Sequence, residues 1–455
     1  MNRPRLPRAF ALLGVLLALL ATMPLASLGE ARASAPNIIV IVTDDMRASD
    51  WQALPKTREI FGDKGTWFPN FIVSTPVCCP SRTTILTGKY VHNHGVLANS
   101  TAGRTPGGWK AFQRNKLERQ TVAFTLRRAG YRTALIGKFI NGFRSKEDAP
   151  AGWDYWAASV TFNYQKFPLN FDGSTKRYRG QAYKTDILGG LAVNFIKKTP
   201  KRQPLFLYFT PTAPHFPATP AKRHRGAFSD VTLERGDAHN DIDVSDKPQW
   251  VQDLPRIDEA GEMKLDELER NRLRTLLATD EAIARIWNAL QSSGRANNTY
   301  VFIMSDNGFM MGEHRVLQKG TPYDGSLRIP MLAFGPGFDG GADERLASTI
   351  DIAPTALTLA GKSANKMDGR SLLDPWDRDA VLIELFQGPA IGAGIRTEDY
   401  LYYEHATGEA EFYDYNTDPA ETTNLMANGG SDPPEAAAAK ARLAELRTCS
   451  GASCR

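Results

Sequence analysis

Two pairs of oxygen-bearing side chains follow two apolar segments of the sequence. Asp44 and Asp45 come just after the run 37–42, and Asp306 and Asn307 come just after the run 300–304. A single pair of this kind more often caps a helix or turn. Two pairs at the carboxyl ends of neighbouring strands would instead converge at one edge of a sheet, where ligands gather. Their all-oxygen set suits Ca²⁺ or Mg²⁺ and suits Zn²⁺ poorly.

A second group of reactive residue types lies in the segment 76–88, which reads PVCCPSRTTILTG. We expect Cys78 to lie just before a helix N-terminus, where the partial positive charge favours an anionic nucleophile. Arg82, one turn later, would hold that anion or a substrate oxyanion. A thiolate, however, pairs badly with a hard cation and oxidises readily. The residues therefore favour an oxygen nucleophile at position 78, unless Cys78 and Cys79 are only small buried hydrophobes.

The elements that must position these groups alternate along the chain. Short apolar runs that predict buried strands recur at 37–42, 133–136, 205–209, 300–304 and 331–334. Helical patterns are expected at 122–129, 265–291 and 350–359. This alternation predicts an α/β fold with a large, mixed but mostly parallel sheet flanked by helices. The segment 213–262 has little periodicity and is expected to be a long surface excursion that shapes a pocket.

The pattern changes after about residue 374. Short strands are expected at 381–386, 393–396, 400–404 and 411–415, followed by a helix at 435–447. We therefore predict a catalytic domain over 36–373 and a small antiparallel sheet with one helix over 374–455.

The N-terminus has the pattern of a secretory signal peptide over 1–35. Arg3, Arg5 and Arg8 precede an apolar run of 12 residues (9–20), and two small-x-small cleavage sites follow. The run is short for a bilayer span, although an uncleaved anchor is the alternative. No later apolar run approaches about 20 residues, so we expect an exported protein without stable membrane insertion.

Charge and cysteine content narrow the function classes further. The chain of 455 residues has a net charge of only +5, with four of its arginines in the first 35 residues, so a nucleic-acid partner is not indicated. Of the four cysteines, Cys449 and Cys454 stand close together and could close a small loop in an oxidising compartment. Adjacent Cys78 and Cys79 are unlikely partners because the geometry of a vicinal disulfide is poor.

The segment 78–82 (CCPSR), followed by Leu86-Thr87-Gly88, resembles the signature of the type I sulfatases in the alkaline phosphatase superfamily. The doubled cysteine and the segment 88–94 (GKYVHNH) most resemble the N-acetylglucosamine-6-sulfatase and arylsulfatase branch. The resemblance covers about 36–425, including a tail similar to the family's Tyr-Asp…Asp-Pro…Glu pattern at 413–421. It implies that a formylglycine-generating enzyme converts Cys78 to formylglycine (3-oxoalanine), whose hydrate supplies an oxygen nucleophile.

The same resemblance assigns roles to further positions of this chain. Asp44, Asp45, Asp306, Asn307 and position 78 match the family's calcium ligands, with Mg²⁺ as an alternative ion. Arg82 matches the arginine that steadies the nucleophile, Lys138 and Lys319 match two sulfate-binding lysines, and His215 matches the histidine near the leaving group. Read alone, the two lysines would be ordinary surface residues and His215 a loop histidine.

One position departs from the pattern of many sulfatases. The family often has a histidine two residues after the first lysine, where this chain has Ile140 followed by Asn141. The residue that expels sulfate is therefore open among His92, His94 and His314. Tyr323, with His94 and His314, is a further candidate for substrate contact, and the basic run 222–225 would suit a polyanionic glycan or be a solvated face.

The sequence thus predicts an exported sulfatase that acts on a sulfated carbohydrate such as 6-O-sulfated N-acetylglucosamine. Two alternatives remain: a phosphodiester or phosphonate monoester hydrolase on the same scaffold, and an unmodified glycan-binding protein without activity.

Overall fold

The computed structural model describes Met1 and the residues 35–427 and 432–455. The chain divides into two units, Met1–Ala35 and Pro36–Arg455, and the second carries the fold. The predicted signal peptide lies almost entirely outside the described residues. In the part that is described, no helix combines the length and apolarity needed to cross a bilayer.

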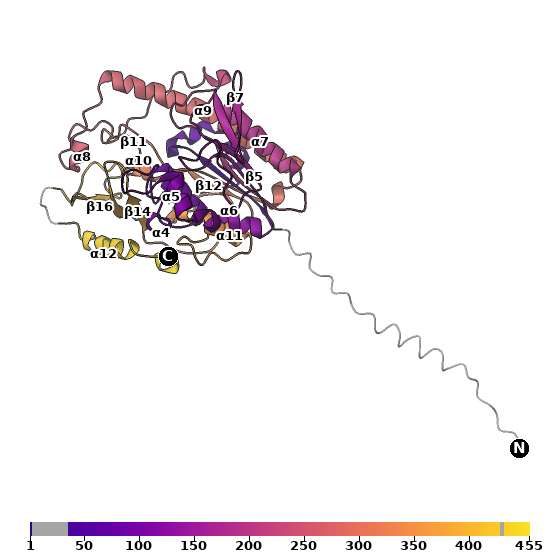
Figure 1. Ribbon diagram of the computed structural model, residues 1–455. Helices are drawn as coiled ribbons and strands as arrows, with labels where there is room; N and C mark the ends of the chain where they lie inside the picture. The colour runs from indigo at the N-terminus through magenta and orange to yellow at the C-terminus, as the bar shows by residue number, and fades with distance from the viewer. Residues whose placement is uncertain (2–34, 428–431) are drawn as a thin grey trace. The chain divides into compact units, whose positions relative to one another are not determined.

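A nine-stranded sheet forms the centre of the larger unit (Figure 1). Its spatial order is β2 (Thr66–Trp67), β12 (Met331–Phe334), β9 (Thr299–Ser305), β1 (Asn37–Thr43), β8 (Leu205–Thr210), β4 (Arg132–Lys138), β5 (Tyr155–Ser159), β6 (Phe167–Phe171) and β7 (Ser174–Tyr178). The five strands from β9 to β5 are parallel to one another. Both edges of the sheet are antiparallel. The predicted mixed, mostly parallel sheet is confirmed.

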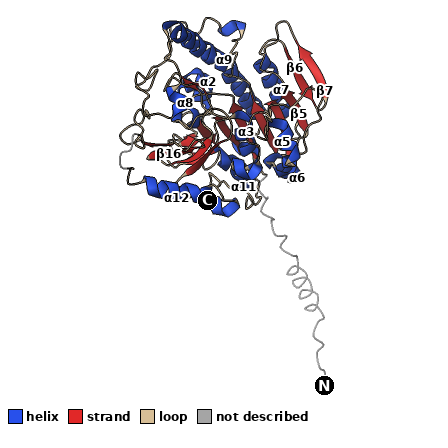
Figure 2. Cartoon of the chain, turned by 60° about the vertical axis from the view of Figure 1, so that its left-hand side comes forward, coloured by secondary structure: helices blue, strands red, loops and turns tan. Residues whose placement is uncertain are grey.

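Helices cover both faces of this sheet, because alternate residues of the apolar strands belong to two separate cores. Ile38 and Val40 of β1 lie in the core shared with α3 (Cys78–Thr87), α5 (Gly108–Arg114), α6 (Val122–Arg128) and α11 (Ile352–Leu359). Ile39 and Ile41 lie in the core shared with α7 (Lys184–Lys198) and α9 (Glu259–Ser292). Figure 2 shows the two groups of helices on opposite sides of the strands. A strand buried on both faces is expected to be a continuous apolar run, as β1 is from Ile38 to Val42.

The C-terminal strands form a second, four-stranded antiparallel sheet. It consists of β14 (Val381–Leu385), β15 (Gly392–Arg396), β16 (Tyr400–His405) and β17 (Ala410–Asp414), in that order. Helix α12 (Ala436–Leu446) covers one face through Ala439 and Leu443. Residues of the other face, such as Tyr403, belong to the same core as β1. The sheet and helix are as expected, and the domain boundary at 373 stays a prediction.

The remaining elements are short. They are η1 (Ala48–Ala53), α2 (Pro55–Phe61), β3 (Phe71–Ile72), α4 (Val91–His94), η2 (Leu117–Gln120), η3 (Lys222–His224), α8 (Gln249–Gln252), η4 (Ala296–Asn298), β10 (Met310–Met311), β11 (Leu317–Gln318), α10 (Asp324–Leu327), β13 (Ala347–Ser348), η5 (Thr349–Asp351) and η6 (Gly451–Cys454). The expected excursion after residue 213 contains only η3 and α8 before α9 begins at Glu259.

The strands β5, β6 and β7 and helix α7 are among the elements that were not predicted. Of these, β7 is a largely exposed polar segment, STKRY. Helix α7 has two adjacent glycines in its middle. Neither segment offers the continuous apolar run that marks the central strands, so tertiary contacts decide these elements.

Candidate active site

The carboxyl ends of β1 and β9 bring the two polar pairs together. Thr43 pairs with Ser305 at the last rung of the parallel ladder, so the residues that follow emerge side by side. The backbone N–H of Asp45 donates to Oδ1 of Asp306 over 3.1 Å. The amide of Asn307 donates from Nδ2 to Oδ1 of Asp45 over 2.7 Å. All four side chains, Asp44 included, are buried.

Helix α3 presents Cys78 to these carboxylates. Val77 is the extended N-cap residue, so Cys78 is the first residue of the helix rather than the residue before it, which corrects the sequence expectation by one position. The helix ends where Gly88 adopts a left-handed conformation with φ of 63°. The thiol Sγ of Cys78 lies 3.8 Å from Oδ1 of Asp44. Ligand atoms of Asp44, Asp45 and Cys78 lie within 4.8 Å of one another.

Three cationic side chains face the three carboxylates. The Nε of Arg82 donates to Oδ2 of Asp306 over 2.8 Å. The ammonium group of Lys138 donates to both oxygens of Asp44, over 2.6 and 2.8 Å. The ammonium group of Lys319 contacts Oδ1 of Asp45 and lies 2.9 Å from the Sγ of Cys78. Formal charges of three carboxylates and three cations therefore balance around the thiol.

The pKa values of Asp44 and Lys138 are shifted in the directions that favour their ionised forms. Burial alone would raise the pKa of Asp44, but Lys138 and the other nearby cations outweigh it and hold this pKa well below the usual range. Burial would lower the pKa of Lys138, and the Asp44 carboxylate reverses the effect and raises it. Burial raises the pKa of the Cys78 thiol to about 11 despite both lysines.

Lys138 is the last residue of β4, so it lies at the carboxyl ends of the parallel strands. Gly137 has a φ of 128°, and a Cβ added there would lie 1.9 Å from the carbonyl oxygen of Thr210 in β8. This close approach of β4 to β8 requires glycine immediately before the lysine. Lys319 follows the strand pair β10 and β11, in which Gln318 has a φ of 86°, unusual for a residue with a side chain.

His215 lies in the loop after β8 with its imidazole toward Asp45. Its Nε2 is 3.8 Å from Oδ2 of Asp45, and its Nδ1 lies 2.7 Å from the carbonyl oxygen of Phe216, which requires a proton on Nδ1. The hydroxyl of Tyr164 donates to the carbonyl oxygen of His215 and fixes the loop. The ring of Phe162 stacks on the imidazole with centroids 4.2 Å apart.

Phe162 was missed by the sequence reasoning. Besides His215, its ring contacts Lys138, whose ammonium nitrogen lies 5.1 Å from the ring centroid. It follows β5 at no distinctive spacing, and a lone phenylalanine between strands gives no functional signal. Only the tertiary structure reveals that one ring touches two of the expected site residues.

The structure does not bring His94, His314 or Tyr323 into this site, which corrects the expectation that they contact a substrate. His94 is buried, bonds to Thr84 and Val96, and has its pKa lowered to about 3 by burial. The Nδ1 of His314 lies 3.0 Å from Asp241. Tyr323 is completely buried and donates to Glu411.

Two other candidates have hydrogen-bond or ion-pair partners outside this site. His92 contacts Glu384 with Nδ1 and the carbonyl oxygen of Cys449 with Nε2. In the basic run 222–225, Arg223 is paired with Asp186 and Glu281. His92 is thus held by structural contacts, and the ion pairs of Arg223 agree with the alternative that the basic run is a solvated charged face.

The donor set fits a hard divalent cation. The carboxylates of Asp44, Asp45 and Asp306 supply anionic oxygens, and the Oδ1 of Asn307 is buried without a hydrogen-bond donor among the described residues. A buried amide oxygen normally has a partner, so a cation at this point would explain its environment.

In the described part of the chain, two cavities are lined by residues of this site. One of about 310 Å³ is lined by Asp45, His215 and Lys319 together with apolar residues of α9 and the β10–β11 pair. The other cavity of the site, of about 120 Å³, is lined by Lys138 and Phe162.

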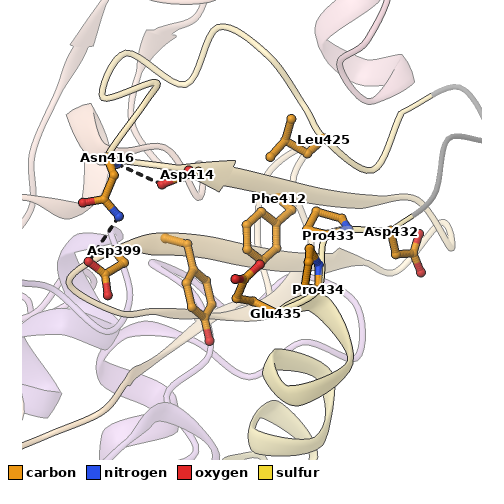
Figure 3. Close-up of a pocket in the computed structure, with 10 residues that line it drawn as sticks. Asp399, Phe412, Asp414, Asn416, Leu425, Asp432, Pro433, Pro434 and Glu435 are labelled. Atoms are coloured by element: carbon orange, nitrogen blue, oxygen red, sulfur yellow. Dashed lines mark hydrogen bonds between the residues drawn. The ribbon is translucent and has the colours of Figure 1, made fainter.

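A larger cavity of about 550 Å³ lies in the C-terminal region beside β16 and β17, with Asp399, Asp414 and Phe412 in its wall (Figure 3). None of the sequence-predicted site residues lines this C-terminal cavity.

Comparison with known proteins points in one direction. The sulfatase family model matches residues 36–362, and a model of the C-terminal part of N-sulphoglucosamine sulphohydrolase matches residues 312–448. An arylsulfatase from Volvox carteri is 31% identical, over 92% of this chain and 75% of its own length. The N-acetylglucosamine-6-sulfatase of Homo sapiens is 30% identical, over 92% of this chain and 86% of its own.

Solved structures agree with the fold. A protein in complex with its substrate D-glucosamine-2-N,6-O-disulfate matches with a TM-score of 0.79 and 25% identity, over 91% of this chain and 97% of its own. The phosphonate monoester hydrolase of Agrobacterium radiobacter matches with a TM-score of 0.68 at 20% identity, over 91% of this chain and 95% of its own, a likeness of fold alone.

Proposed function

The chain belongs to the sulfatase family and is a sulfatase, and on this premise we propose that it hydrolyses a sulfate ester of a carbohydrate with an oxygen nucleophile made from Cys78. The observation that carries the proposal is the arrangement around the Cys78 thiol, which has Asp44 3.8 Å away on one side and Lys319 2.9 Å away on the other.

The unmodified thiol is a poor nucleophile in this place. With its pKa raised to about 11 by burial, it stays protonated at neutral pH. Conversion of its side chain to an aldehyde, the modification that marks this family, would supply a hydrate oxygen instead. Position 78 thereby offers the hard donor that the neighbouring carboxylates and a divalent cation require.

Each remaining residue has a task that its position supports. Asp44, Asp45, Asp306 and Asn307 would hold calcium, which would polarise the sulfuryl oxygens. The ammonium groups of Lys138 and Lys319 would bind those oxygens and offset the charge that develops as the S–O bond breaks. Arg82, fully buried against Asp306, would orient the carboxylate and the nucleophile.

The leaving alcohol needs a proton, and we propose two donors for it. His215 keeps Nδ1 on a backbone carbonyl and turns Nε2 toward Asp45, so a protonated ring has one N–H free for the leaving oxygen. Lys319, on the same cavity, is the second donor.

The substrate class follows from the relatives. Proteins named N-acetylglucosamine-6-sulfatase from Homo sapiens and Bacteroides thetaiotaomicron are 30% and 27% identical to the chain. We infer a sulfated glycan substrate, with 6-O-sulfated N-acetylglucosamine as the first candidate.

Export is part of the same proposal. Relatives from Caenorhabditis elegans and Drosophila melanogaster carry the name extracellular sulfatase. Cys449 and Cys454 form a disulfide, which persists in oxidising compartments. Both facts support an exported enzyme with a cleaved signal peptide.

Mass spectrometry of the peptide that contains residue 78, from exported protein, tests the nucleophile. We expect the cysteine to be converted, with loss of sulfur, and Cys78→Ala to abolish sulfate release. Cys79→Ala is the matched control, because the Sγ of Cys79 accepts from the backbone N–H of Asn141 and donates to the carbonyl oxygen of Asn99. An intact thiol in active protein would refute the proposal.

A phosphonate or phosphate ester hydrolase is the second candidate, since a phosphonate monoester hydrolase has this fold. Turnover of 4-nitrophenyl sulfate, phosphate and phenylphosphonate esters, measured side by side, separates the two. We expect the sulfate ester to have the highest kcat/KM.

A further inference from the structure

The cavity of about 310 Å³ beside Lys319 and His215 is lined mainly by apolar side chains. Leu265 and Phe309 form a buried wall, and Leu268 of α9 lies beside them. At the mouth, Phe216 and Leu317 are 68% and 50% exposed, although both are large apolar side chains. Exposed apolar side chains that rim a concave site mark a binding surface.

The cations that line this cavity already have partners. Lys319 contacts Asp45, and His215 faces the same carboxylate. Arg272 donates to the Asp45 carbonyl oxygen over 2.6 Å and to Oδ2 of Asp50 over 2.7 Å. Each basic side chain among the described lining residues thus already faces a carboxylate, and the one Arg272 nitrogen that is buried without a hydrogen-bond partner, Nε, has no exposed surface.

The size of the cavity also limits its occupant. Its volume of about 310 Å³ lies at the lower end of the range for ligand pockets. One sugar ring with a small substituent fits this space better than several residues of a glycan chain.

We propose that this cavity binds the uncharged, apolar side of the leaving sugar, its N-acyl group included, and thereby selects singly sulfated amino sugars over N-sulfated ones. The inference rests on the sulfatase function proposed above. An N-sulfo group in the same place would lose water contacts against Leu265, Leu268 and Phe309 without gaining a cation. An N-acyl group would bury apolar surface there.

Binding and turnover of three esters test this specificity. The 6-sulfates of N-acetyl-, N-butanoyl- and N-sulfoglucosamine are compared by steady-state sulfate release with the converted enzyme. They are also compared by titration calorimetry with the Cys78→Ala protein, in the presence of calcium. We expect the N-acetyl ester to exceed the N-sulfo ester about tenfold in kcat/KM and in affinity, a difference of about 1.4 kcal/mol. The N-butanoyl ester should bind at least as tightly as the N-acetyl ester.

A positive charge placed in the apolar wall should weaken the preference for the N-acetyl ester. Leu268→Lys adds a cation beside Leu265, so we expect the ratio of N-acetyl to N-sulfo affinity to fall about fivefold or more. Met263→Lys is the matched control, because it adds the same charge to the exposed side of the same helix, where Met263 is 61% exposed. It should leave the ratio unchanged.

The outcomes separate this inference from the proposed function. Sulfate release from none of the esters would refute the proposed substrate class, while the calorimetric ratio would still report the preference of the cavity. Equal or tighter binding of the N-sulfo ester, an unchanged ratio in Leu268→Lys, or binding of none of the three esters would overturn the inference.

Discussion

At the scale of single residues, the charged side chains around the Cys78 sulfur neutralise one another. There are three pairs of a carboxylate and a cation, and in each pair the two groups lie within 3 Å of each other. The pairs are Asp306 with Arg82, Asp44 with Lys138, and Asp45 with Lys319. Buried charges are tolerated only when they are paired in this way. A divalent cation would add two positive charges to this balance, and an anionic sulfate ester would offset one of them.

Removal of one cation should therefore affect catalysis strongly. We expect Lys138→Ala to lower kcat by about a hundredfold to a thousandfold, the usual effect of removing one donor to developing negative charge. Sulfate release from 4-nitrophenyl sulfate measures it, and circular dichroism checks the fold. Lys110→Ala, which changes an exposed lysine, should keep wild-type activity. Near-normal turnover in Lys138→Ala would exclude the lysine from sulfate binding.

The charge balance also predicts linked binding of cation and anion. Chelation with EDTA should lower Tm by a few degrees, since a ligand bound only to the native state stabilises it. Calcium should restore Tm, and inorganic sulfate should raise Tm more with calcium than without it. Thermal unfolding with and without calcium, each in the presence and absence of inorganic sulfate, measures the effect. Strictly additive shifts would contradict the linkage.

At the scale of elements, the active groups depend on two close backbone contacts. The parallel ladder of β1 and β9 aligns the two acidic pairs, and the approach of β4 to β8 at Gly137 sets the position of Lys138. In both cases, a contact between two strand backbones sets the position of the side chains that follow it.

Gly137→Ala should damage stability and activity together. The added Cβ would meet the Thr210 carbonyl oxygen, and backbone cannot move aside cheaply, so we expect a loss of about 2 kcal/mol or more in the free energy of unfolding. The displaced Lys138 should lower kcat as well. Gly190→Ala, inside α7 with nothing within 4 Å, should instead stabilise by about 1 kcal/mol. Urea unfolding and sulfate release measure both variants.

The link between α10 and the C-terminal sheet should depend on pH. Burial, with Asp324 nearby, raises the pKa of Glu421 from 4.5 to about 8. The native state therefore holds a proton that the unfolded chain has lost, and stability should fall as pH rises from about 4.5 to about 8. Glu421→Gln cannot ionise and should lose less stability across this window than the wild type.

Urea unfolding at about pH 5 and about pH 8.5 brackets the window for that comparison. Glu398→Gln, at an exposed carboxylate two residues beyond β15, is the control and should follow the wild type. If the free energy of unfolding of Glu421→Gln fell between these two pH values by as much as that of the wild type, Glu421 would not titrate in the native state as predicted.

At the scale of the whole unit, one core connects the two sheets. Tyr403 and Tyr413 of the C-terminal sheet lie in the same apolar cluster as Val40 of β1. The C-terminal sheet is thus anchored to the catalytic part, and a change near its end should act through stability rather than chemistry.

The disulfide between Cys449 and Cys454 allows that expectation to be tested. By the chain-entropy relation for so short a loop, replacing both cysteines with serine should cost about 2 kcal/mol of stability. Because neither residue contacts the site, kcat and KM should stay within a factor of about two at a temperature where the variant is folded. A large loss of kcat in folded variant protein would contradict this separation.

The sequence by itself determined the chemistry-bearing residues and the central strands. The run 38–42 is apolar at every position because both faces of the strand are covered, so the sequence alone reveals the strand. The spacing of Cys78, Arg82 and the acidic pairs pointed to one site. The structure brings these residues together with Lys138, Lys319 and His215, and their catalytic roles remain a proposal.

Only the tertiary structure decided which other residues join that site. Tyr323 and His94 looked available in the sequence but are enclosed by partners distant along the chain, such as Glu411 for Tyr323. Phe162 had no signal and yet touches Lys138 and His215. The physical reason is that burial and contact are sums over residues from many elements, whereas a sequence pattern reports only the neighbours along one strand or helix.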